Sequence, residues 1–224
     1  MTCDMASFAS IKEFAAAFAA RHDRLDVLVN NAGMMFAQRE LTVDGIEATF
    51  AVNHLGYYLV TNLLRDLLVR SAPARVVIVA SAAHKRARLD WDDLTRGDRF
   101  SGFRTYSTSK LCNILFTYEL ARRLDGTGVT ANCLHPGVVA SHFGSTAAPA
   151  FRTLVQIGRP FLMSSRRGAK TSIHLAASPE VDGVTGGYFA KSRPARSSAI
   201  SRDPAAQARL WALSAELTGV GDRI

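Results

Sequence analysis

The chain has 224 residues, of which 48% are hydrophobic, and these values fit one folded domain with a sizeable core. Its three cysteines form no CxxC pair, so neither a disulfide framework nor a zinc site is indicated. The formal net charge of +8 would suit a polyanion-binding basic domain, but because the arginines and lysines are scattered we expect no nucleic-acid partner.

The first predicted element is a helix from Ser7 to about His22. Ser7 can cap it, and apolar residues recur at helical spacing on one face, which we expect to cover a core. The N-terminus lacks the charged start and apolar core of a secretory signal. Asp4 and Glu13 also argue against an acid-poor transit peptide, so a cytoplasmic location is expected.

Two predicted strands flank a long helical segment. Leu25–Asn30 is a short apolar run without alternation, which is typical of a strand buried on both faces of a parallel sheet, and Arg75–Ala80 repeats the pattern. Between them, Asp44–Arg70 has helical periodicity. Arg65 and Asp66 interrupt its most apolar part, so no membrane span is predicted.

The next helix carries a possible acid–base pair. After a long polar loop of the kind that is commonly functional, a helix is predicted from Phe103 to about Leu124, with Tyr106 and Lys110 one turn apart on one face. An ammonium near a phenol favours the phenolate, so we expect the pKa of Tyr106 to fall below its usual value of roughly 10. Such a phenol suits alcohol and carbonyl chemistry. An aromatic residue at a core edge beside a solvated charge is the alternative reading of this pair.

The last part of the chain predicts a third strand, a helix, a short strand and a final helix, at Val129–His135, 165–177, 186–189 and 203–217. Strands that alternate with helices imply right-handed crossovers, a parallel sheet and helices on both faces. We therefore predict a single α/β domain over residues 1–224.

Other chemistries find little support in the sequence. No two histidines have the one-turn spacing of a helical zinc site, so no metal is expected, and no G-x-S-x-G elbow indicates a serine hydrolase. His54, His84 and His135 each flank a motif. Histidines in such places are more often packing or hydrogen-bonding residues, so they are assigned no chemistry.

Five motifs occur in the order and spacing of the short-chain dehydrogenase/reductase family: Asn30-Asn31-Ala32-Gly33, Asn53-His54-Leu55-Gly56, Ser81, Tyr106-x-x-x-Lys110 and Pro136-Gly137. The amino-acid sequences of several stretches, among them residues 25–33 and 109–113, resemble the branch that contains retinol dehydrogenases and the WW-domain oxidoreductase. The resemblance covers nearly the whole chain. It implies a doubly wound, Rossmann-like parallel sheet. It also implies an NAD(P)-dependent oxidoreductase that interconverts a lipophilic alcohol and its carbonyl.

The resemblance also implies roles for four residues in catalysis. Tyr106 would exchange the proton of the substrate oxygen while hydride moves to or from the nicotinamide. Lys110 would lower the pKa of Tyr106 and bind the nicotinamide ribose. Ser81 would orient the substrate oxygen, although a serine that merely ends a strand is common. Asn53 would interrupt its helix locally and hold a water that relays protons to Lys110.

A further set of residues would hold the dinucleotide, and the resemblance favours NADP slightly over NAD. Asn31, Ala32 and Gly33 would let the backbone approach the adenine ribose, since a side chain at Gly33 would clash. Asp4 matches an acidic position that helps hold adenine. The run after the third strand would present backbone and hydroxyl groups to the carboxamide, through Pro136, Gly137, Val139 and Ser141.

The sequence departs from the family in lacking the glycine-rich turn that receives the pyrophosphate. In family terms the chain is N-terminally truncated, without the first two strands and most of the third, so Leu25–Asn30 is expected at an open sheet edge. A non-catalytic fragment or interaction module is therefore the alternative function. By analogy with the family, a homodimer through the helices at 44–70 and 103–124 is also expected.

Overall fold

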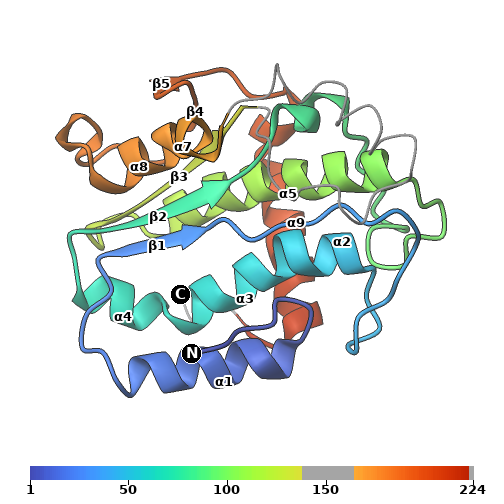
Figure 1. The fold of residues 1–224 in the computed structure, drawn as a ribbon, viewed down its shortest axis with the longest axis horizontal. Helices are drawn as coiled ribbons and strands as arrows, with labels where there is room; N and C mark the ends of the chain where they lie inside the picture. Colours follow the sequence, from blue (N-terminus) through green and yellow to red (C-terminus); the bar gives the residue numbers. More distant parts are fainter. Residues whose placement is uncertain (138–163, 222–224) are drawn as a thin grey trace.

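The computed structural model describes residues 1–137 and 164–221, which form an open five-stranded sheet with helices packed on it (Figure 1). The strand order is β1-β2-β3-β4-β5; the first four strands are parallel and β5 is antiparallel to β4. The strands are β1 (Val27–Asn30), β2 (Ala74–Val79), β3 (Val129–His135), β4 (Tyr188–Ala190) and β5 (Arg193–Pro194). The predicted α/β fold with a mainly parallel sheet is confirmed.

Helices occupy most of the remaining described chain. The α-helices are α1 (Phe8–Ala19), α2 (Ala48–Phe50), α3 (Gly56–Leu63), α4 (Arg65–Arg70), α5 (Gly102–Arg123), α7 (Ser165–Gly168), α8 (Lys170–Ala177) and α9 (Pro204–Thr218). A π-helical turn, η1 (Ala51–Leu55), and three short 3₁₀ helices, η2 (Ala82–Arg86), η4 (Pro179–Val181) and η5 (Ile200–Arg202), complete them. No helix in these residues is long and apolar enough to cross a membrane.

Strand β2 shows why the sheet must be covered on both faces. Val76 and Ile78 belong to a buried cluster with residues of α3 and α5, whereas Val77 and Val79 pack with Leu175 of α8 on the other face. Successive side chains of a strand point to opposite faces, so an uninterrupted apolar run needs helices on both sides. This confirms the doubly wound arrangement that the sequence predicts.

Helix α1 packs on other helices instead of covering the sheet. The Ser7 hydroxyl caps it by accepting a hydrogen bond of 3.3 Å from the backbone N–H of Ser10, as predicted. Its fully buried Ile11 lies in a cluster with Leu55 and Leu59, and no strand residue is part of that cluster. The buried face predicted for this helix is confirmed, and helical residues bury it within the described chain.

The predicted helix over residues 44–70 is divided into four parts, α2, η1, α3 and α4. Asn53 lies in the middle of the π-helical turn η1, which confirms the local interruption expected at this residue. Such π-helical turns are frequent at functional sites. The division leaves Asn53 fully buried beneath α5 rather than on a regular helical surface.

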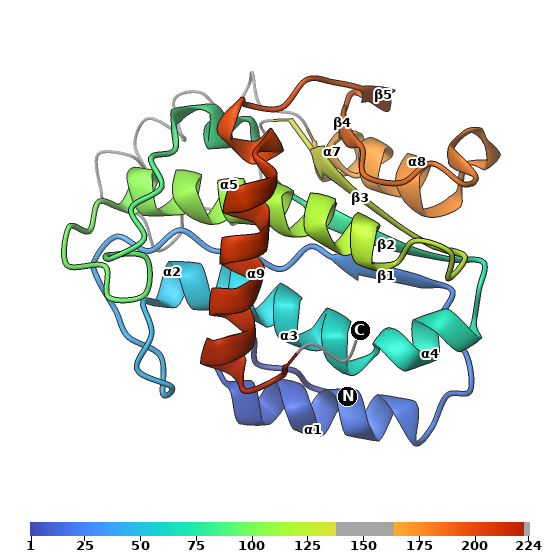
Figure 2. The ribbon, with the colours of Figure 1, turned by 180° about the vertical axis from the view of Figure 1, so that it is seen from behind.

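Helix α9 crosses the side of α5 that faces away from the sheet (Figure 2). Trp211 of α9 stacks on Phe116 of α5 with 5.7 Å between ring centroids, and Arg122 Nη1 donates a hydrogen bond to Gln207. The homodimer expected through the helices at 44–70 and 103–124 stays a prediction.

Candidate active site

Helix α5 carries the residues at the centre of the candidate site. It begins at Gly102, where a Cβ would come 2.7 Å from the backbone oxygen of Phe36, so glycine is required by this close approach. Tyr106 and Lys110 follow one turn apart. Lys110 Nζ reaches the carboxyl end of β2 and donates a hydrogen bond of 3.0 Å to the backbone oxygen of Val79.

The ammonium of Lys110 is buried without a counter-ion. The residue is 3% exposed, and its Nζ lies 5.7 Å from the ring centroids of both Tyr57 and Tyr106. Within the part of the chain that the structure describes, no carboxylate pairs with Lys110, and Val79 is its one hydrogen-bond acceptor. Burial without a compensating charge lowers the pKa of Lys110 to about 7.

Tyr106 lies beside Ser81, and burial dominates its ionisation. The tyrosine is 9% exposed, and burial raises its pKa to about 12, although a hydrogen bond with the Ser81 side chain acts in the opposite direction. The expectation that Lys110 lowers this pKa below its usual value was wrong for the chain as described. Desolvation of the phenolate outweighs the stabilisation that the neighbouring groups provide.

Ser81 lies between the carboxyl end of β2 and the start of η2. It is the N-cap of η2, where its hydroxyl accepts a hydrogen bond of 3.2 Å from the backbone N–H of Ala83. The same residue is the hydrogen-bond partner of Tyr106. The structure therefore brings together Ser81 and the Tyr106–Lys110 pair, although these residues come from different elements.

Asn53 and Gly33 complete the group around Lys110. The Asn53 side chain accepts a hydrogen bond from the backbone N–H of Met34 and donates to Met34 O and to Ser109 Oγ, at 2.8 to 3.0 Å. A Cβ at Gly33 would lie 3.1 Å from Asn53 Oδ1 and 3.2 Å from Lys110 Nζ. A side chain at Gly33 would thus press on both polar groups. The four predicted catalytic residues and Gly33 lie in one neighbourhood.

The predicted cofactor-binding residues lie at the carboxyl ends of neighbouring strands. Asn31 and Ala32 follow β1, and the Tyr57 hydroxyl fixes their loop by donating a hydrogen bond of 2.6 Å to Ala32 O. Pro136 and Gly137 follow β3, which pairs with β2. In open α/β sheets, ligands bind in the crevice outside these strand ends.

Three other predicted cofactor residues receive less support. The Asp4 carboxylate accepts a hydrogen bond of 2.9 Å from the backbone N–H of Ala6, which gives it a local role before α1, and its contact with adenine stays a prediction. Val139 and Ser141 lie outside the described residues.

Two buried residues beside the predicted group, Asn113 and His84, were not predicted from the sequence as part of it. Asn113 donates a hydrogen bond of 3.2 Å to Val79 O, the oxygen that also accepts from Lys110. Its position seven residues after Tyr106, hence on the same face of the helix, was a usable signal. His84 lies three residues after Ser81 and hydrogen-bonds to it, but nothing in a single sequence separates it from a packing histidine.

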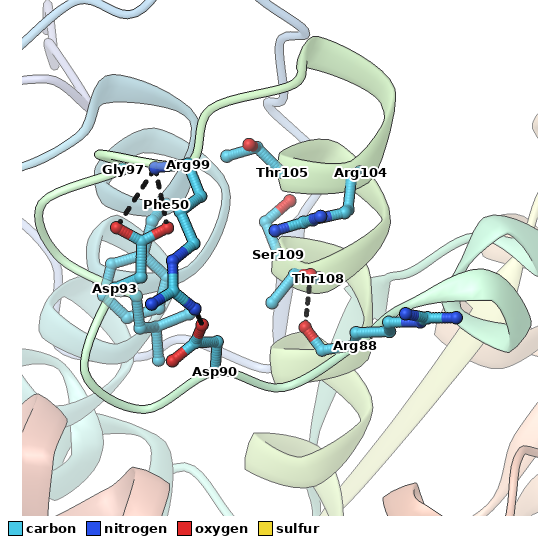
Figure 3. A pocket seen from close by; sticks show the side chains of 11 residues that line it. Phe50, Arg88, Asp90, Asp93, Gly97, Arg99, Arg104, Thr105, Thr108 and Ser109 are labelled. Carbon is cyan, nitrogen blue, oxygen red and sulfur yellow. Dashed lines mark hydrogen bonds and ion pairs between the residues drawn. The ribbon is translucent and has the colours of Figure 1, made fainter.

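A small cavity lies on another side of α5 and is not part of this group (Figure 3). Its volume is about 40 Å³, and its lining includes Arg104, Thr105 and Thr108 of α5 and residues of the loop before that helix. Tyr106 and Lys110 do not line it. Ser109 connects the two regions, since it lines this cavity and also accepts the hydrogen bond from Asn53.

Comparison with known proteins gives the same family as the five sequence motifs. The family model described as short chain dehydrogenase matches residues 1–150. Human retinol dehydrogenase 12 is 41% identical over 217 residues, which cover 97% of this chain and 68% of the relative. Mouse retinol dehydrogenase 14 is 41% identical over 223 residues, and human WW domain-containing oxidoreductase is 40% identical over 226 residues. The chain spans 66% and 54% of these last two proteins.

Solved structures agree with the fold. The crystal structure of an uncharacterised protein from Mycobacterium paratuberculosis superposes with a TM-score of 0.75 at 33% identity, covering 99% of this chain and 76% of the other. A short chain dehydrogenase from Burkholderia cenocepacia in complex with NADP has a TM-score of 0.63 at 24% identity, with coverage of 84% and 73%. The second likeness supports the sheet and its helices alone.

Proposed function

Because this chain belongs to the short-chain dehydrogenase family, we propose that it is an NAD(P)-dependent oxidoreductase that interconverts a lipophilic alcohol and its carbonyl, with Tyr106 as the proton donor or acceptor. The observation that carries the proposal is the buried contact of Tyr106 with Ser81, next to a lysine without a counter-ion. Strongly shifted pKa values at the carboxyl ends of parallel strands favour a functional site over a structural one.

The residues at these strand ends fit a nicotinamide dinucleotide. An ammonium has three N–H donors, and Lys110 uses one of them within the described chain, which leaves donors suited to the hydroxyl groups of a ribose. Gly33 keeps side-chain atoms away from the same ammonium. The bound nicotinamide would supply or accept the hydride. NADP is the coenzyme we favour, because the sequence resembles the branch of the family that contains the retinol dehydrogenases.

In alcohol oxidation, the chain's own groups would move and hold one proton. The Ser81 hydroxyl would orient the substrate oxygen, and Tyr106 would accept the hydroxyl proton as the C–H bond loses its hydride. Lys110 in its charged form would stabilise the phenolate by proximity. In the reverse direction Tyr106 would donate the proton to the carbonyl oxygen. Asn53 would hold the backbone of Met34 and the side chain of Ser109 in place through its three hydrogen bonds.

The test uses Tyr106→Phe, with Tyr58→Phe as a matched control whose hydroxyl lies 3.4 Å from Val220 O, outside the site. Retinol with NADP is a suitable probe because the relatives are named for retinol. We expect Tyr106→Phe to lower turnover by roughly 10²- to 10⁴-fold, the usual contribution of a general acid–base group, while NADP binding persists. Substantial turnover in Tyr106→Phe would refute the role of this residue.

One observation favours the alternative, a non-catalytic interaction module. Strand β1 pairs with β2, no other strand of the described chain pairs with its outer edge, and Val29 is 43% exposed. An open strand edge can pair with another chain. A well-folded sample that binds neither NAD nor NADP would support the module and would contradict the proposed enzyme.

A further inference from the structure

His84 is a buried histidine that the proposed reaction does not use. It is 1% exposed and lies in η2, three residues after Ser81. Both ring nitrogens have partners, since Nδ1 lies 2.6 Å from the backbone oxygen of Ser81 and Nε2 lies 3.1 Å from the backbone nitrogen of Ser198. The imidazole therefore connects two segments that are 114 residues apart in sequence.

These two partners select one form of the ring. The Ser198 N–H is a donor, so Nε2 must accept and carry no proton, and the Ser81 oxygen is an acceptor, so Nδ1 must carry the proton. A doubly protonated ring would turn a second N–H towards the Ser198 N–H. The ionisable groups around the ring are Lys85 on its own helix, His135 at the end of β3, and Tyr188 of β4, whose ring packs edge-on at 5.2 Å.

The ring also fixes the orientation of Ser81. The Ser81 carbonyl oxygen accepts two hydrogen bonds from His84, one from the backbone N–H at 3.2 Å and one from Nδ1 at 2.6 Å. The Ser81 hydroxyl accepts a hydrogen bond from the Ala83 N–H and is hydrogen-bonded to Tyr106. With its carbonyl held by two donors, the peptide plane of Ser81 cannot rotate without breaking both bonds.

The far end of this connection is itself anchored. Ser197, next to Ser198, shares a hydrogen bond of 2.8 Å with the Tyr118 hydroxyl of α5, and the fully buried Ser201 donates to Ser197 Oγ at 2.8 Å. The segment before α9 is thus tied to the same helix that carries Tyr106. The imidazole closes a ring of contacts from α5 through Ser198 to Ser81 and back to α5.

We propose that His84 is a positioning residue: as the neutral Nδ1–H tautomer, it holds Ser81 in the orientation that Tyr106 and the substrate oxygen require. The segment around Ser198 selects that tautomer. The role in turnover rests on the proposed function, because Ser81 and Tyr106 act on a substrate only if the chain is an oxidoreductase.

Two variants separate the two ends of the imidazole. In His84→Asn the amide nitrogen takes the place of Nδ1 and can still donate to Ser81 O. In His84→Gln the amide oxygen reaches the place of Nε2 and can still accept from Ser198 N–H. Each variant keeps one buried hydrogen bond and loses the other, so both are expected to lower Tm to a similar degree.

Turnover of retinol with NADP should tell the variants apart. We expect His84→Asn to keep kcat within about threefold of wild type and His84→Gln to lose roughly 10- to 100-fold in kcat with little change in KM, because misplacing a catalytic group costs up to about 10²-fold. Equal losses in the two folded variants, or no loss in either, would overturn the proposal. Wild-type chain without turnover would instead refute the proposed oxidoreductase.

A measurement without substrate tests the tautomer itself. Long-range ¹⁵N–¹H NMR correlations of the histidine rings, assigned by the signals missing in His84→Asn, should show an Nδ1–H and an unprotonated Nε2 at neutral pH. An Nε2–H tautomer or a charged ring would overturn the proposal, whether or not the chain turns over retinol.

Discussion

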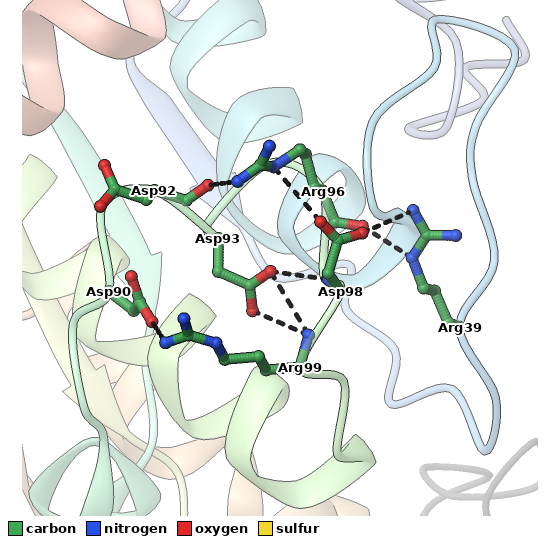
Figure 4. Close-up of polar contacts among 7 residues, drawn as sticks. All are labelled: Arg39, Asp90, Asp92, Asp93, Arg96, Asp98 and Arg99. Carbon is green, nitrogen blue, oxygen red and sulfur yellow. Dashed lines mark hydrogen bonds and ion pairs between the residues drawn. The ribbon is translucent and has the colours of Figure 1, made fainter.

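The two sides of α5 differ in whether their charged side chains are exposed and paired. On the side that meets the sheet, Lys110 is 3% exposed and has no carboxylate partner in the described chain. In the loop next to the other side, exposed arginines pair with aspartates (Figure 4): Arg99 with Asp90 at 2.8 Å, and Arg96 with Asp98 at 3.4 Å. The ion pairs of this loop are thus formed where water already solvates the arginines.

This contrast separates function from stability. Exposed ion pairs typically contribute about 0 to 1 kcal/mol, whereas a buried charge without a partner destabilises a fold. Packing cannot explain why α5 buries the ammonium of Lys110 against the end of β2, because an apolar side chain of the same length would be buried with less desolvation. A site for proton transfer does explain it, because burial also shifts its pKa into the physiological range.

The largest effect is expected for Lys110→Met. Turnover of retinol should fall by at least about 10²-fold with the loss of the positioned ammonium, while the free energy of unfolding at neutral pH should rise by roughly 2 kcal/mol as the desolvation cost disappears. Lys12→Met, on the exposed face of α1, is the control and should change neither quantity. A less stable Lys110→Met protein would show that the ammonium stabilises the fold.

The same lysine predicts how stability depends on pH. Its pKa of about 7 in the folded chain is below the value of about 10.4 expected after unfolding, so the unfolded state binds more protons between these values. Wild-type stability should therefore rise from pH 7 to pH 10 relative to Lys110→Met, and urea unfolding of both proteins at several pH values would measure the difference. If the free energies of unfolding of the two proteins changed with pH in the same way, the lowered pKa of Lys110 would be contradicted.

Gly33→Ala should have an intermediate effect on the buried side. Its Cβ would lie 3.1 Å from Asn53 Oδ1 and 3.2 Å from Lys110 Nζ, so both groups must shift. We expect a loss of about 1 to 2 kcal/mol in stability from overpacking and a fall of about tenfold in kcat. Gly221→Ala, where no atom lies within 4 Å of the new Cβ, is the control. Equal free energies of unfolding and equal kcat in the two variants would show that Gly33 is not part of the site.

The smallest effect is expected in the loop. Arg99→Ala removes the exposed pair with Asp90, whose arginine side chain is 72% exposed. The free energy of unfolding should change by less than about 0.5 kcal/mol, and turnover should not change. Thermal unfolding and the retinol assay measure both. A loss as large as that in Gly33→Ala would mean that the two sides of α5 do not differ as proposed.

Sequence alone predicted the parts of this contrast that depend on local pattern. The unbroken apolar run of β2 required helices on both faces, and the spacing of Tyr106 and Lys110 placed them on one face of a helix. Both features follow from the periods of strands and helices. The interruption at Asn53 was predicted from the family resemblance, because nothing in the local sequence distinguishes a π-helical turn from a regular one.

The missing parts depend on contacts between distant segments. The rise in the pKa of Tyr106 comes from burial by the assembled fold, and this effect reversed the prediction made from Lys110 alone. The partners of His84 were unpredictable because Ser198 is 114 residues away. The surface that buries Ile11 proved to be helical for the same reason. Periodicity identifies the buried face, and only the fold identifies its partner.

The most direct test of the account is the titration of Lys110 itself. The chain has five lysines, and the other four, Lys12, Lys85, Lys170 and Lys191, are exposed, so isotope labelling of lysine gives a simple NMR spectrum in which the signal absent from Lys110→Met identifies Lys110. We expect a midpoint near pH 7 for this signal, far below the value of about 10.4 for a lysine in water. A midpoint for Lys110 near about pH 10.4 would contradict a buried ammonium without a counter-ion and the catalytic role built on it.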